Sequence, residues 1–329
     1  MKFNVITIGG VVRDVLFYTD QGELIKNSKN SLKQELLGFE FGAKIYSESV
    51  YFAVGGGAAN TAASFAKLGF KVGLISQIGS DFNGDVVKNE LNYKNINLSG
   101  LKIDSHSKTG FSFLVVDKKS GEHTVFAYRG AGDELEVTKA DLGKNQSAWF
   151  YLASLSGKAW RKSLKNIFSV SKNIAWNPGS SQLKAGYRFL RPYINKTTIF
   201  NVNKDEALEL ALSKNKKFNA KATTKSLLSE IKTWGAEIVI ITDGRQGSTA
   251  FDGKNYYYQA TLKNLPVDTT GAGDCFGATF LAGYIKFNSD ISKAMQFATV
   301  NASSLVSEIG AQVGLLSYSE VLKRMKKLL

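Results

Sequence analysis

One stretch near the C-terminal end decides how this chain folds: Val267-Asp268-Thr269-Thr270-Gly271-Ala272-Gly273-Asp274-Cys275-Phe276-Gly277-Ala278-Thr279-Phe280. A polar, glycine-punctuated loop runs directly into a helix of small apolar residues. The backbone N–H groups of Gly271, Ala272 and Gly273 can point at an anion, with the positive end of the helix dipole behind them. Asp274 is at the edge of this cradle. A tight turn with a capping Asp is the plain interpretation, whereas an anion cradle beside an acid suits phosphoryl transfer to a hydroxyl.

A second glycine-rich segment, Gly55-Gly56-Gly57-Ala58-Ala59-Asn60, precedes another expected helix. Consecutive glycines let the backbone approach a small ligand closely. The Asn60 amide can both donate to and accept from a hydroxyl. A tight turn into a closely packed, alanine-rich helix explains the same residues equally well. Neither a dinucleotide-binding Gly-x-Gly-x-x-Gly after the first strand nor a Gly-x4-Gly-Lys-Ser/Thr P-loop occurs, so both classes are disfavoured.

The composition is that of a globular protein, with 329 residues, 43% of them hydrophobic, and mixed charge. This length suffices for one large α/β domain. No run of 18 or more apolar residues occurs, and residues 1–8 lead into a strand-like run without the layout of a signal peptide. Cys275 is the only cysteine, so no internal disulfide can form. These features predict a cytoplasmic protein that does not use a membrane.

The 42 basic and 28 acidic residues give a formal net charge of +14. Such an excess suits nucleic acid, an anionic substrate or a solvated lysine surface. The lysines are scattered and are not interleaved with aromatic residues in one stripe, so we do not expect nucleic-acid binding. His106 and His123 lie apart, without the spacing of metal ligands, which disfavours a zinc site.

Short apolar runs alternate with amphipathic stretches along most of the chain. The expected buried strands are residues 3–9, 71–78, 148–153, 173–176, 197–201 and 238–242. Expected helices include residues 58–68, 160–169 and 223–234, and a hairpin is expected from 248–251 and 255–259. The repetition predicts an α/β fold with a doubly wound, mainly parallel sheet and helices on both faces.

Two regions interrupt this alternation. Residues 12–54 contain strand-like pieces around a polar insert, Gln21–Leu36. Residues 110–116 and 123–128 are alternating runs joined by a turn signal at 117–121. Strands without crossover helices do not belong in a parallel sheet. We therefore expect a separate small antiparallel β-sheet beside the main domain.

In their order and spacing, about 210 residues apart, the two glycine-rich segments resemble the two signatures of the ribokinase-like (PfkB) carbohydrate kinase family. Between them, Asn203-Lys204-Asp205-Glu206 matches the family's Asn-x-x-Glu motif. The segment Thr242-Asp243-Gly244-Arg245-Gln246-Gly247 is similar to its nucleotide-binding loop. A capping box and a plain turn are the structural alternatives for these two segments. The resemblance implies one kinase domain over 1–329, with a lid subdomain formed by approximately 12–54 and 105–130.

The resemblance also implies roles for individual residues. Asp274 would be the general base, and Gly271, Ala272 and Gly273 would form the anion hole. ATP would be contacted by residues of the later motifs and the C-terminal helices: Asn203, Glu206, Thr242, Gly244, Gly247, Thr270 and Asn301. Glu206 would organise Mg²⁺ through water, and Asp268 and Thr270 would hold a monovalent cation such as K⁺.

On the acceptor side, the resemblance assigns substrate binding to Asp14, Gly55, Gly56, Gly57 and Asn60, and the position of Arg129 at the end of the expected hairpin makes it a further candidate. The Asp14 carboxylate can accept from two vicinal hydroxyls of a polyol. Arg129 would suit a sugar acid or a sugar phosphate, although an Arg at a strand end is by default a surface residue. Ribokinases proper have Asn where this chain has Val12, which puts ribose as the acceptor in doubt.

The implied function is ATP-dependent phosphorylation of a hydroxyl on a small carbohydrate. Three alternatives stay open: a nucleoside kinase of the same fold, a phosphosugar kinase, and a non-catalytic sugar- or nucleotide-binding regulator. Phosphosugar relatives often have Lys in the glycine core where this chain has Gly57, which argues against that alternative. The lid is expected to close over the sugar. As in relatives, it would pair with the lid of a second subunit in a homodimer, a pairing that the insert Gln21–Leu36 would alter.

Overall fold

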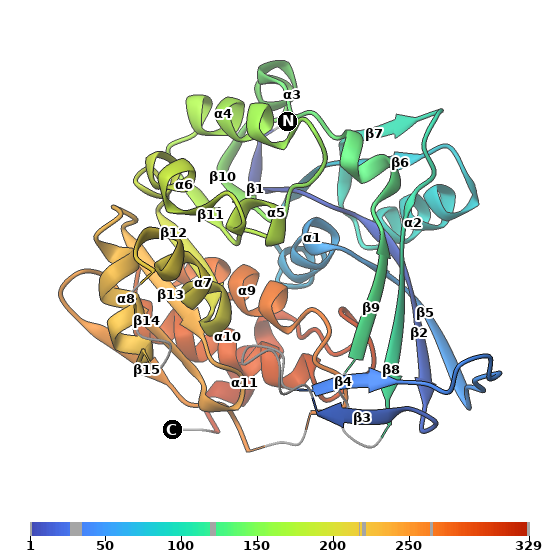
Figure 1. The fold of residues 1–329 in the computed structure, drawn as a ribbon. Helices are drawn as coiled ribbons and strands as arrows, with labels where there is room; N and C mark the ends of the chain where they lie inside the picture. The colour runs from blue at the N-terminus through green and yellow to red at the C-terminus, as the bar shows by residue number, and fades with distance from the viewer. Residues whose placement is uncertain are drawn as a thin grey trace.

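The computed structural model describes residues 2–26, 35–118, 123–216, 218, 222–263 and 266–327. At its centre is a nine-stranded sheet in the order β15-β14-β13-β12-β11-β10-β1-β6-β7 (Figure 1). The strands are β1 (Phe3–Ile8), β6 (Val72–Gly79), β7 (Asn97–Asp104), β10 (Ser147–Leu152), β11 (Ile174–Trp176), β12 (Ile199–Asn203), β13 (Ile238–Thr242), β14 (Ser248–Phe251) and β15 (Tyr256–Gln259). The strands from β7 to β13 in this order pair in parallel, and the β14–β15 hairpin adds an antiparallel edge. The expected mainly parallel sheet and the expected hairpin are both confirmed.

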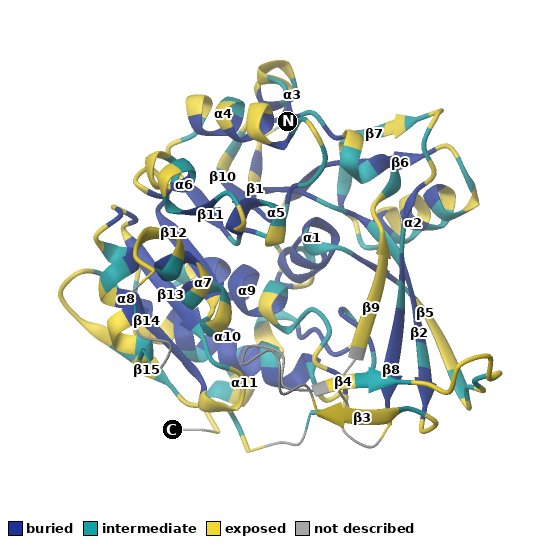
Figure 2. Ribbon diagram, in the orientation of Figure 1, coloured by how far each residue is buried: buried dark blue, intermediate teal, exposed yellow. Residues whose placement is uncertain are grey.

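Helices cover both faces of this sheet (Figure 1). One face packs against α1 (Gly57–Lys67), α2 (Phe82–Tyr93), α9 (Ala272–Lys286), α10 (Ile291–Leu305) and α11 (Tyr318–Met325). The other packs against α3 (Lys139–Lys144), α4 (Trp160–Val170), α5 (Ser180–Leu183), α6 (Gly186–Ile194), α7 (Lys204–Lys214) and α8 (Thr224–Lys232). Each face thus has its own hydrophobic core, and Figure 2 shows the central strands and the inner sides of these helices as buried. Strands buried on both faces read as continuous apolar runs, which is why the sequence revealed them.

The order of the strands reverses beside β1. After β1 the chain builds β6 and β7 on one side, and it later returns to build β10, β11, β12 and β13 on the other. In open parallel sheets, ligands bind outside the carboxyl ends of the strands at such a reversal. The segments that follow β1 and β10 are therefore the expected walls of a binding site.

A second sheet of four strands stands beside the main one, in the order β5 (Ser49–Gly55), β2 (Val12–Thr19), β8 (Gly110–Asp117) and β9 (His123–Tyr128) (Figure 1). The β5–β2 and β8–β9 pairs are antiparallel, as expected, whereas the central β2–β8 pair is parallel. The parallel pairing of β2 with β8 follows from the path of the chain. Since β2 follows β1 and β8 follows β7, both continue from parallel strands of the main sheet and leave its carboxyl edge in the same direction.

The two faces of this small sheet carry different residues. Asp14 and Ser112 are cross-strand neighbours on the face toward the main domain. On the opposite, outer face, Phe52, Phe113 and Phe126 lie in one row across the sheet. The sheet therefore presents polar groups inward and an aromatic surface outward.

Part of the predicted insert Gln21–Leu36 forms a two-stranded antiparallel sheet of β3 (Glu23–Lys26) and β4 (Glu35–Gly38). The rest of the insert, residues 27–34, lies outside the described residues, as does 119–122 in the turn predicted between β8 and β9. Among the helices that the structure describes, none has the length and apolar character needed to cross a membrane.

Candidate active site

Asp274 lies in the first turn of α9 and borders two cavities at once. The residue before the helix, Gly271, has φ +74°, and a side chain there would bring its Cβ within 2.6 Å of the Ala311 Cβ. Only glycine fits this turn. The turn holds Asp274 on the lining of a cavity of about 370 Å³ and of a second cavity of about 200 Å³. A group bound in either cavity can therefore reach the same carboxylate.

The sequence predicts an anion cradle at the start of α9, and the hydrogen bonds there correct one part of that prediction. The N–H of Ala272 donates to the Thr269 carbonyl oxygen at 3.2 Å, so it closes the turn and is not free for an anion as predicted. The described residues offer no backbone acceptor to the N–H groups of Gly271 and Gly273, and both residues line the smaller cavity. The predicted cradle therefore has two amides available rather than three.

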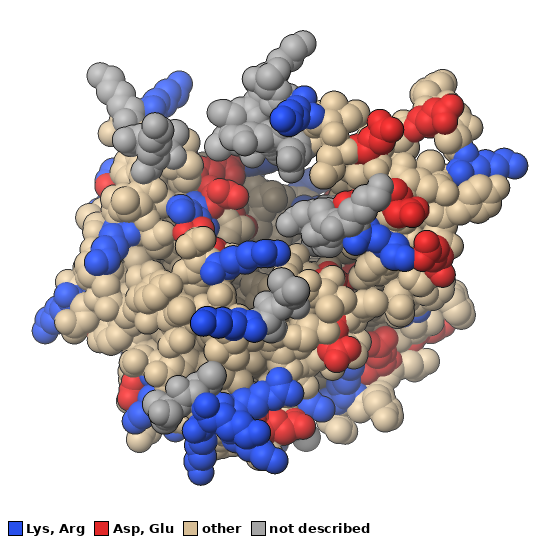
Figure 3. Space-filling model, turned by 90° about the horizontal axis from the view of Figure 1, so that it is seen from below, with Lys and Arg blue, Asp and Glu red and all other residues tan. Residues whose placement is uncertain are grey.

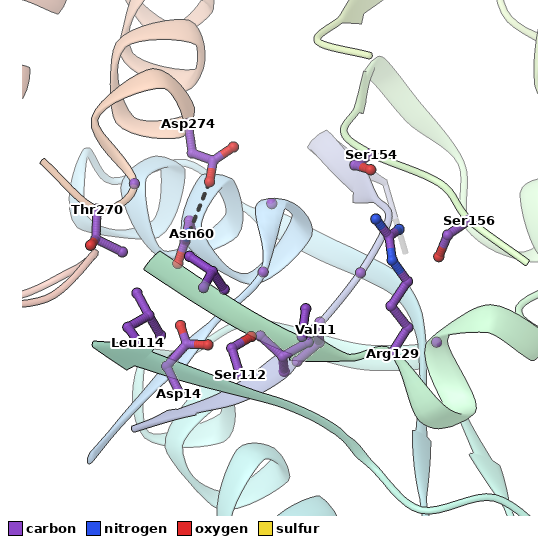
Figure 4. A pocket seen from close by; sticks show the side chains of 18 of the residues that line it. Val11, Asp14, Asn60, Ser112, Leu114, Arg129, Ser154, Ser156, Thr270 and Asp274 are labelled. Atoms are coloured by element: carbon purple, nitrogen blue, oxygen red, sulfur yellow. Dashed lines mark hydrogen bonds between the residues drawn. The ribbon is translucent and has the colours of Figure 1, made fainter. Parts of the chain in front are cut away.

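The larger cavity lies between the small sheet and the main domain (Figure 4). Its polar lining comes from the segments after β1 and β10, from the small sheet and from the start of α1 and α9: Asp14, Asn60, Ser112, Arg129, Ser154, Ser156, Thr270 and Asp274. In Figure 4, the Asp14 carboxylate and the Arg129 guanidinium lie on opposite sides of this cavity. No carboxylate of the described residues forms an ion pair with Arg129. The cavity therefore offers an acceptor of hydroxyl hydrogens on one side and a cation on the other.

Asp14 is a buried carboxylate. Burial raises its pKa to about 6, against the opposing effects of a hydrogen bond from Ser112 and of the neighbouring Arg13 charge. Gly55 accommodates it, because a side chain at that position would overlap the Asp14 carboxylate. Gly55 does not line either cavity. It makes room for Asp14, which corrects its predicted role in touching the substrate.

The other predicted residues of the first glycine segment do line the larger cavity. Gly56 has φ +91° and lies against the Gly10 backbone, and a Cβ on Gly57 would be 3.4 Å from Asp274 Oδ1. The Asn60 amide is already engaged within the protein. Its Nδ2 donates to Asp274 Oδ2 at 2.9 Å, and its Oδ1 accepts from Gln312 Nε2 at 3.0 Å. Asn60 thus holds the carboxylate of Asp274, a contact that the sequence did not predict.

The smaller cavity opens on the other side of Asp274. It is lined by polar residues at the carboxyl ends of successive strands, among them Asn177, Asn203 and Thr242, and by Glu206 in the first turn of α7. Asn203 and Glu206 form the capping box expected as a structural alternative. The Asn203 N–H donates to Glu206 Oε2 and the Glu206 N–H donates to Asn203 Oδ1, both at 2.8 Å. Burial raises the pKa of Glu206, and nearby acidic charges, including Asp274, add to this effect. Glu206 is therefore both a helix cap and a cavity residue.

Three residues predicted to contact nucleotide line neither cavity. Asn301 is fully buried, with its Nδ2 donating to Thr279 Oγ1 and its Oδ1 accepting the Leu316 N–H, both at 2.9 Å. Both polar groups of the Asn301 amide are therefore hydrogen-bonded inside the core, which corrects its predicted contact with the nucleotide. Gly247 has a close backbone neighbour in Gln259, which explains the glycine without a ligand, and Gly244 has open space around it.

Asp268 is 2% exposed and ties two loops together. Its Oδ1 accepts from the Thr270 N–H at 2.8 Å and from Thr270 Oγ1 at 2.6 Å, and its Oδ2 accepts from the Gly310 N–H at 2.8 Å. Thr270 lines the larger cavity rather than the smaller one. In the part of the chain that the structure describes, no group of three or more His, Cys, Asp or Glu side chains forms a metal centre.

Several polar residues of the site were missed in the sequence. Asn177 and Ser154 follow β11 and β10 closely, and this position at the carboxyl end of a parallel strand was a usable signal. Ser112 reaches the site only because β8 pairs with β2 and places it beside Asp14. Gln312 reaches Asn60 from a loop 252 residues away, which no local pattern reveals.

The molecular surface agrees in charge with an anionic ligand. The face drawn in Figure 3 is hollowed near its centre, and basic side chains gather on it, most densely toward the lower part of that view. A net positive field raises the local concentration of anionic substrates.

Comparisons with known proteins support the fold and show the family of the chain. Residues 23–317 match the family model described as pfkB family carbohydrate kinase. A ribokinase of Bacillus subtilis is 25% identical over 285 residues, which cover 85% of this chain and 90% of the relative. The structure of a nucleoside kinase of Methanocaldococcus jannaschii has a TM-score of 0.76 at 23% identity and covers 98% of each chain. A putative ribokinase II from E. coli in complex with ATP and Mg²⁺ has a TM-score of 0.77 at 20% identity, covering 98% of this chain and 99% of that one.

Proposed function

Because the chain belongs to the pfkB family of carbohydrate kinases and is a phosphotransferase with an alcohol group as acceptor, we propose that it transfers the γ-phosphoryl group of Mg-ATP to a hydroxyl of a small sugar or sugar acid. The observation that carries this proposal is the position of Asp274, which borders both cavities. The acceptor occupies the larger cavity and the nucleotide phosphates occupy the smaller one. The attacking hydroxyl and the γ-phosphate then meet at Asp274.

The proposed chemistry needs one proton acceptor and one anion site. Asp274 accepts the proton of the acceptor hydroxyl as its oxygen bonds to the γ-phosphorus and the bond from that phosphorus to the bridging oxygen of ADP breaks. The N–H groups of Gly271 and Gly273 stabilise the charge on the transferred group. Burial raises the pKa of Asp274, which makes it a stronger base, while the hydrogen bond from Asn60 opposes that rise.

The donors of the smaller cavity fit a magnesium–phosphate complex. Glu206, Asn177 and Asn201 supply oxygen atoms to its lining, and the buried Asn201 Oδ1 has no partner among the described residues. Mg²⁺ prefers oxygen ligands and keeps several waters, which Glu206 would orient. When bound, the ion neutralises charge on the phosphates. Asn203, Glu206 and Thr242 remain our proposed contacts to the nucleotide. Gly244 lies further along the loop that begins at Thr242.

A monovalent cation is proposed beside Asp268 and Thr270. The Asp268 carboxylate is buried, and its three hydrogen bonds come from uncharged N–H and O–H groups. A buried carboxylate with only neutral donors favours a nearby cation. K⁺ would supply that charge and stabilise the loop that begins α9.

The small sheet, with its surrounding segments 12–54 and 105–130, is proposed to act as a lid over the acceptor. Asp14 and Ser112 on its inner face would bind hydroxyls, and the lid would exclude water from the transferring phosphoryl group. Arg129 lies across the cavity without an ion-pair partner among the described carboxylates. A sugar acid, with hydroxyls at one end and a carboxylate at the other, matches both groups.

A nucleoside is the second candidate acceptor, because the nucleoside kinase of Methanocaldococcus jannaschii shares the fold over nearly the whole chain. A phosphosugar is disfavoured by Gly57, which leaves the space beside Asp274 without a cationic side chain. A non-catalytic regulator is disfavoured because the proposed base, Asp274, and the proposed anion cradle border two adjoining cavities.

The test of the function is ADP release from Mg-ATP with a panel of acceptors, with and without K⁺. The panel contains ribose, fructose, 2-keto-3-deoxygluconate, fructose phosphates, adenosine and inosine. We expect one strong acceptor among the sugars and sugar acids, with faster release in K⁺ than in Na⁺. Turnover only with nucleosides would replace the proposed acceptor class, and ATP binding without turnover on any acceptor would support the regulator.

Asp274→Asn tests the base directly. The amide keeps the size of the side chain but cannot take a proton, so we expect turnover to fall by about 10²–10⁴. ATP binding, measured by calorimetry, and the melting temperature should be retained. Near-normal turnover in this variant would refute the assignment of Asp274 as the base.

A further inference from the structure

A chain of hydrogen bonds leads from the surface of α2 to Asp274. Lys94, at the end of α2, donates from Nζ to Gln312 Oε1 at 2.5 Å. Gln312 Nε2 donates to Asn60 Oδ1 at 3.0 Å and to the Val54 carbonyl oxygen at 2.8 Å. Asn60 Nδ2 donates to Asp274 Oδ2 at 2.9 Å. The loop after α10, the helix α1 and the helix α9 are thereby joined to α2.

The direction of every bond in this chain is fixed by its first donor. The ammonium group of Lys can donate and cannot accept. It therefore holds Gln312 with its oxygen toward Lys94, so that both amide hydrogens face Val54 and Asn60. That donation in turn holds the Asn60 oxygen toward Gln312 and its NH₂ group toward Asp274. If either amide turned over, an oxygen would face an oxygen at the next link.

We propose that Lys94 and Gln312 are positioning residues for Asp274, which set the orientation of the Asn60 amide and so hold one oxygen of the carboxylate while the other faces the acceptor. This inference rests on the proposed function. Oδ2 is bound by Asn60, whereas Oδ1 faces the space that Gly57 leaves open by having no side chain. Oδ1 is thus the oxygen placed to take the proton.

The hydrogen-bonded series Lys94–Gln312–Asn60–Asp274 is called the relay from here on. Lys94 also has a simpler explanation, as a residue that only stabilises the end of α2. Glu90 lies one turn before Lys94 on α2, and the two form an ion pair at 2.7 Å, with Arg13 3.9 Å from the other oxygen of Glu90. A surface pair of this kind at the end of a helix stabilises the helix only slightly. Lys94 differs from such a residue because the same Nζ also donates to Gln312. If Lys94 only stabilises the helix, its loss should not affect Asp274. If the relay operates, its loss should lower kcat.

The relay should also alter the pH dependence of turnover. The charged and titratable groups around Asp274 are Asp14, Glu206, Tyr151 and Cys275, with Arg129 across the cavity. The hydrogen bond from Asn60 lowers the pKa of Asp274. If that bond is lost, the pKa of the base rises, and the acid limb of the kcat–pH profile moves to higher pH.

The first experiment compares Lys94→Met with Lys88→Met. Both substitutions remove a lysine charge from α2, but Lys88 is exposed and has no contact with Gln312. For K94M we expect kcat to fall roughly tenfold, the loss of about one hydrogen bond in the transition state. The KM for ATP and for the acceptor should stay within about twofold, and the acid limb should move to higher pH. Lys94→Arg, which restores a cationic donor, should recover most of kcat, and K88M should match the wild type.

A second variant, Gln312→Glu, changes polarity without changing size. The carboxylate keeps the contact with Lys94 but has no hydrogen to donate, so Asn60 is free to turn its NH₂ group toward position 312 and its oxygen toward Asp274. We expect a loss in kcat larger than that of K94M, on the order of 10²-fold. Circular dichroism and the melting temperature establish that both variants are folded.

Asp274→Asn, assayed alongside, separates the two claims. The relay is supported if D274N loses turnover and K94M and Q312E show the expected falls in kcat with the shifted acid limb. It is overturned if D274N loses turnover while K94M and Q312E keep the kcat and the pH profile of the wild type. If D274N itself retains turnover, the proposed function fails and the relay fails with it.

Discussion

At the scale of single residues, the site is built from carboxylates in unfavourable surroundings. Burial raises the pKa of Asp14, Glu206 and Asp274, and the charge of Asp274 raises the pKa of the other two further. Burying a charged group without a cationic partner costs folding free energy. The fold tolerates this cost where the proposed chemistry needs an acceptor of protons or of hydroxyl hydrogen bonds.

We expect Asp14→Asn to weaken acceptor binding and to stabilise the fold at neutral pH. Loss of the charge weakens the hydrogen bonds from acceptor hydroxyls, so the acceptor KM should rise roughly 10- to 100-fold. In the folded wild type the pKa of Asp14, about 6, lies above its ordinary value of 3.8. Between about pH 4 and pH 6 the folded protein keeps a proton on Asp14 that the unfolded chain has lost. The free energy of unfolding therefore falls as the pH rises through this range, and the fall is complete above it. The variant should melt at a higher temperature at pH 7.5, with little difference near pH 4.

Thermal melts across this range and steady-state kinetics check both halves of this expectation. Asp85→Asn is the matched control, because Asp85 lies on the exposed side of α2, away from the cavity. It should change neither KM nor the pH dependence of stability. An Asp14→Asn protein with unchanged acceptor KM would show that Asp14 does not bind the substrate.

Single residues with local signals were predictable from the sequence, and residues that depend on tertiary neighbours were not. Asp274 and the glycines before it were found because a helix start and its cradle are encoded within a few consecutive residues. Gln312 was not predicted as a site residue, since its partner Asn60 lies 252 residues away. Asn301 was assigned to the nucleotide, although packing places its amide in the core.

At the scale of elements, the parallel strands were the most predictable part of the fold. A strand such as β13 is buried on both faces, so residues 238–241 are a continuous apolar run. The small sheet was expected from its alternating runs, but the parallel pairing of β2 with β8 was not. That pairing follows from how both strands leave the main sheet, which depends on topology and not on local pattern.

A substitution of Glu206, in the first turn of α7, can show whether this residue only caps the helix or also serves the proposed reaction. In Glu206→Gln, the side-chain carbonyl oxygen can still accept the Asn203 N–H, so the capping box persists and the melting temperature should stay close to that of the wild type. The negative charge that would organise the magnesium waters is lost. We expect the Mg²⁺ concentration for half-maximal turnover to rise about tenfold.

Titration of turnover with Mg²⁺ at fixed ATP measures this change. Glu237→Gln, an exposed substitution just before β13, controls for the loss of one acidic charge and should leave the Mg²⁺ requirement unaltered. A lower melting temperature with an unaltered Mg²⁺ requirement would show that Glu206 is only a helix cap.

At the scale of the whole molecule, the site exists only where distant segments meet. The contact between Asn60 and Asp274 joins residues 214 positions apart, at the reversal of strand order beside β1. The sequence predicted most of the parts and the general rule that places them. It did not predict which side chains would touch, because those contacts depend on how two sheets and two layers of helices pack.

The outer face of the small sheet carries the last prediction. Large apolar side chains on this face stay exposed in the single chain: Phe52 by 65%, Phe126 by 59%, Tyr128 by 54% and Val50 by 43%. Phe52, Val15, Phe113 and Phe126 lie in one row across the four strands, and the ring of Phe113 is 6.5 Å from that of Phe126. A contiguous apolar patch of this kind marks an interaction surface.

We propose that a second copy of the chain covers this face, because a patch that repeats on both partners can bury itself around a two-fold axis. The double substitution Phe52→Asp and Phe126→Asp places charges in the row, so it should convert a dimer to a monomer in sedimentation velocity at micromolar concentration. Phe82→Asp, at an 80% exposed position on α2, should leave the assembly unchanged. Since the same sheet is the proposed lid, the monomer should also show a raised acceptor KM. A monomeric wild-type protein would rule out this dimer. A double variant that stays dimeric would place the contact on another face.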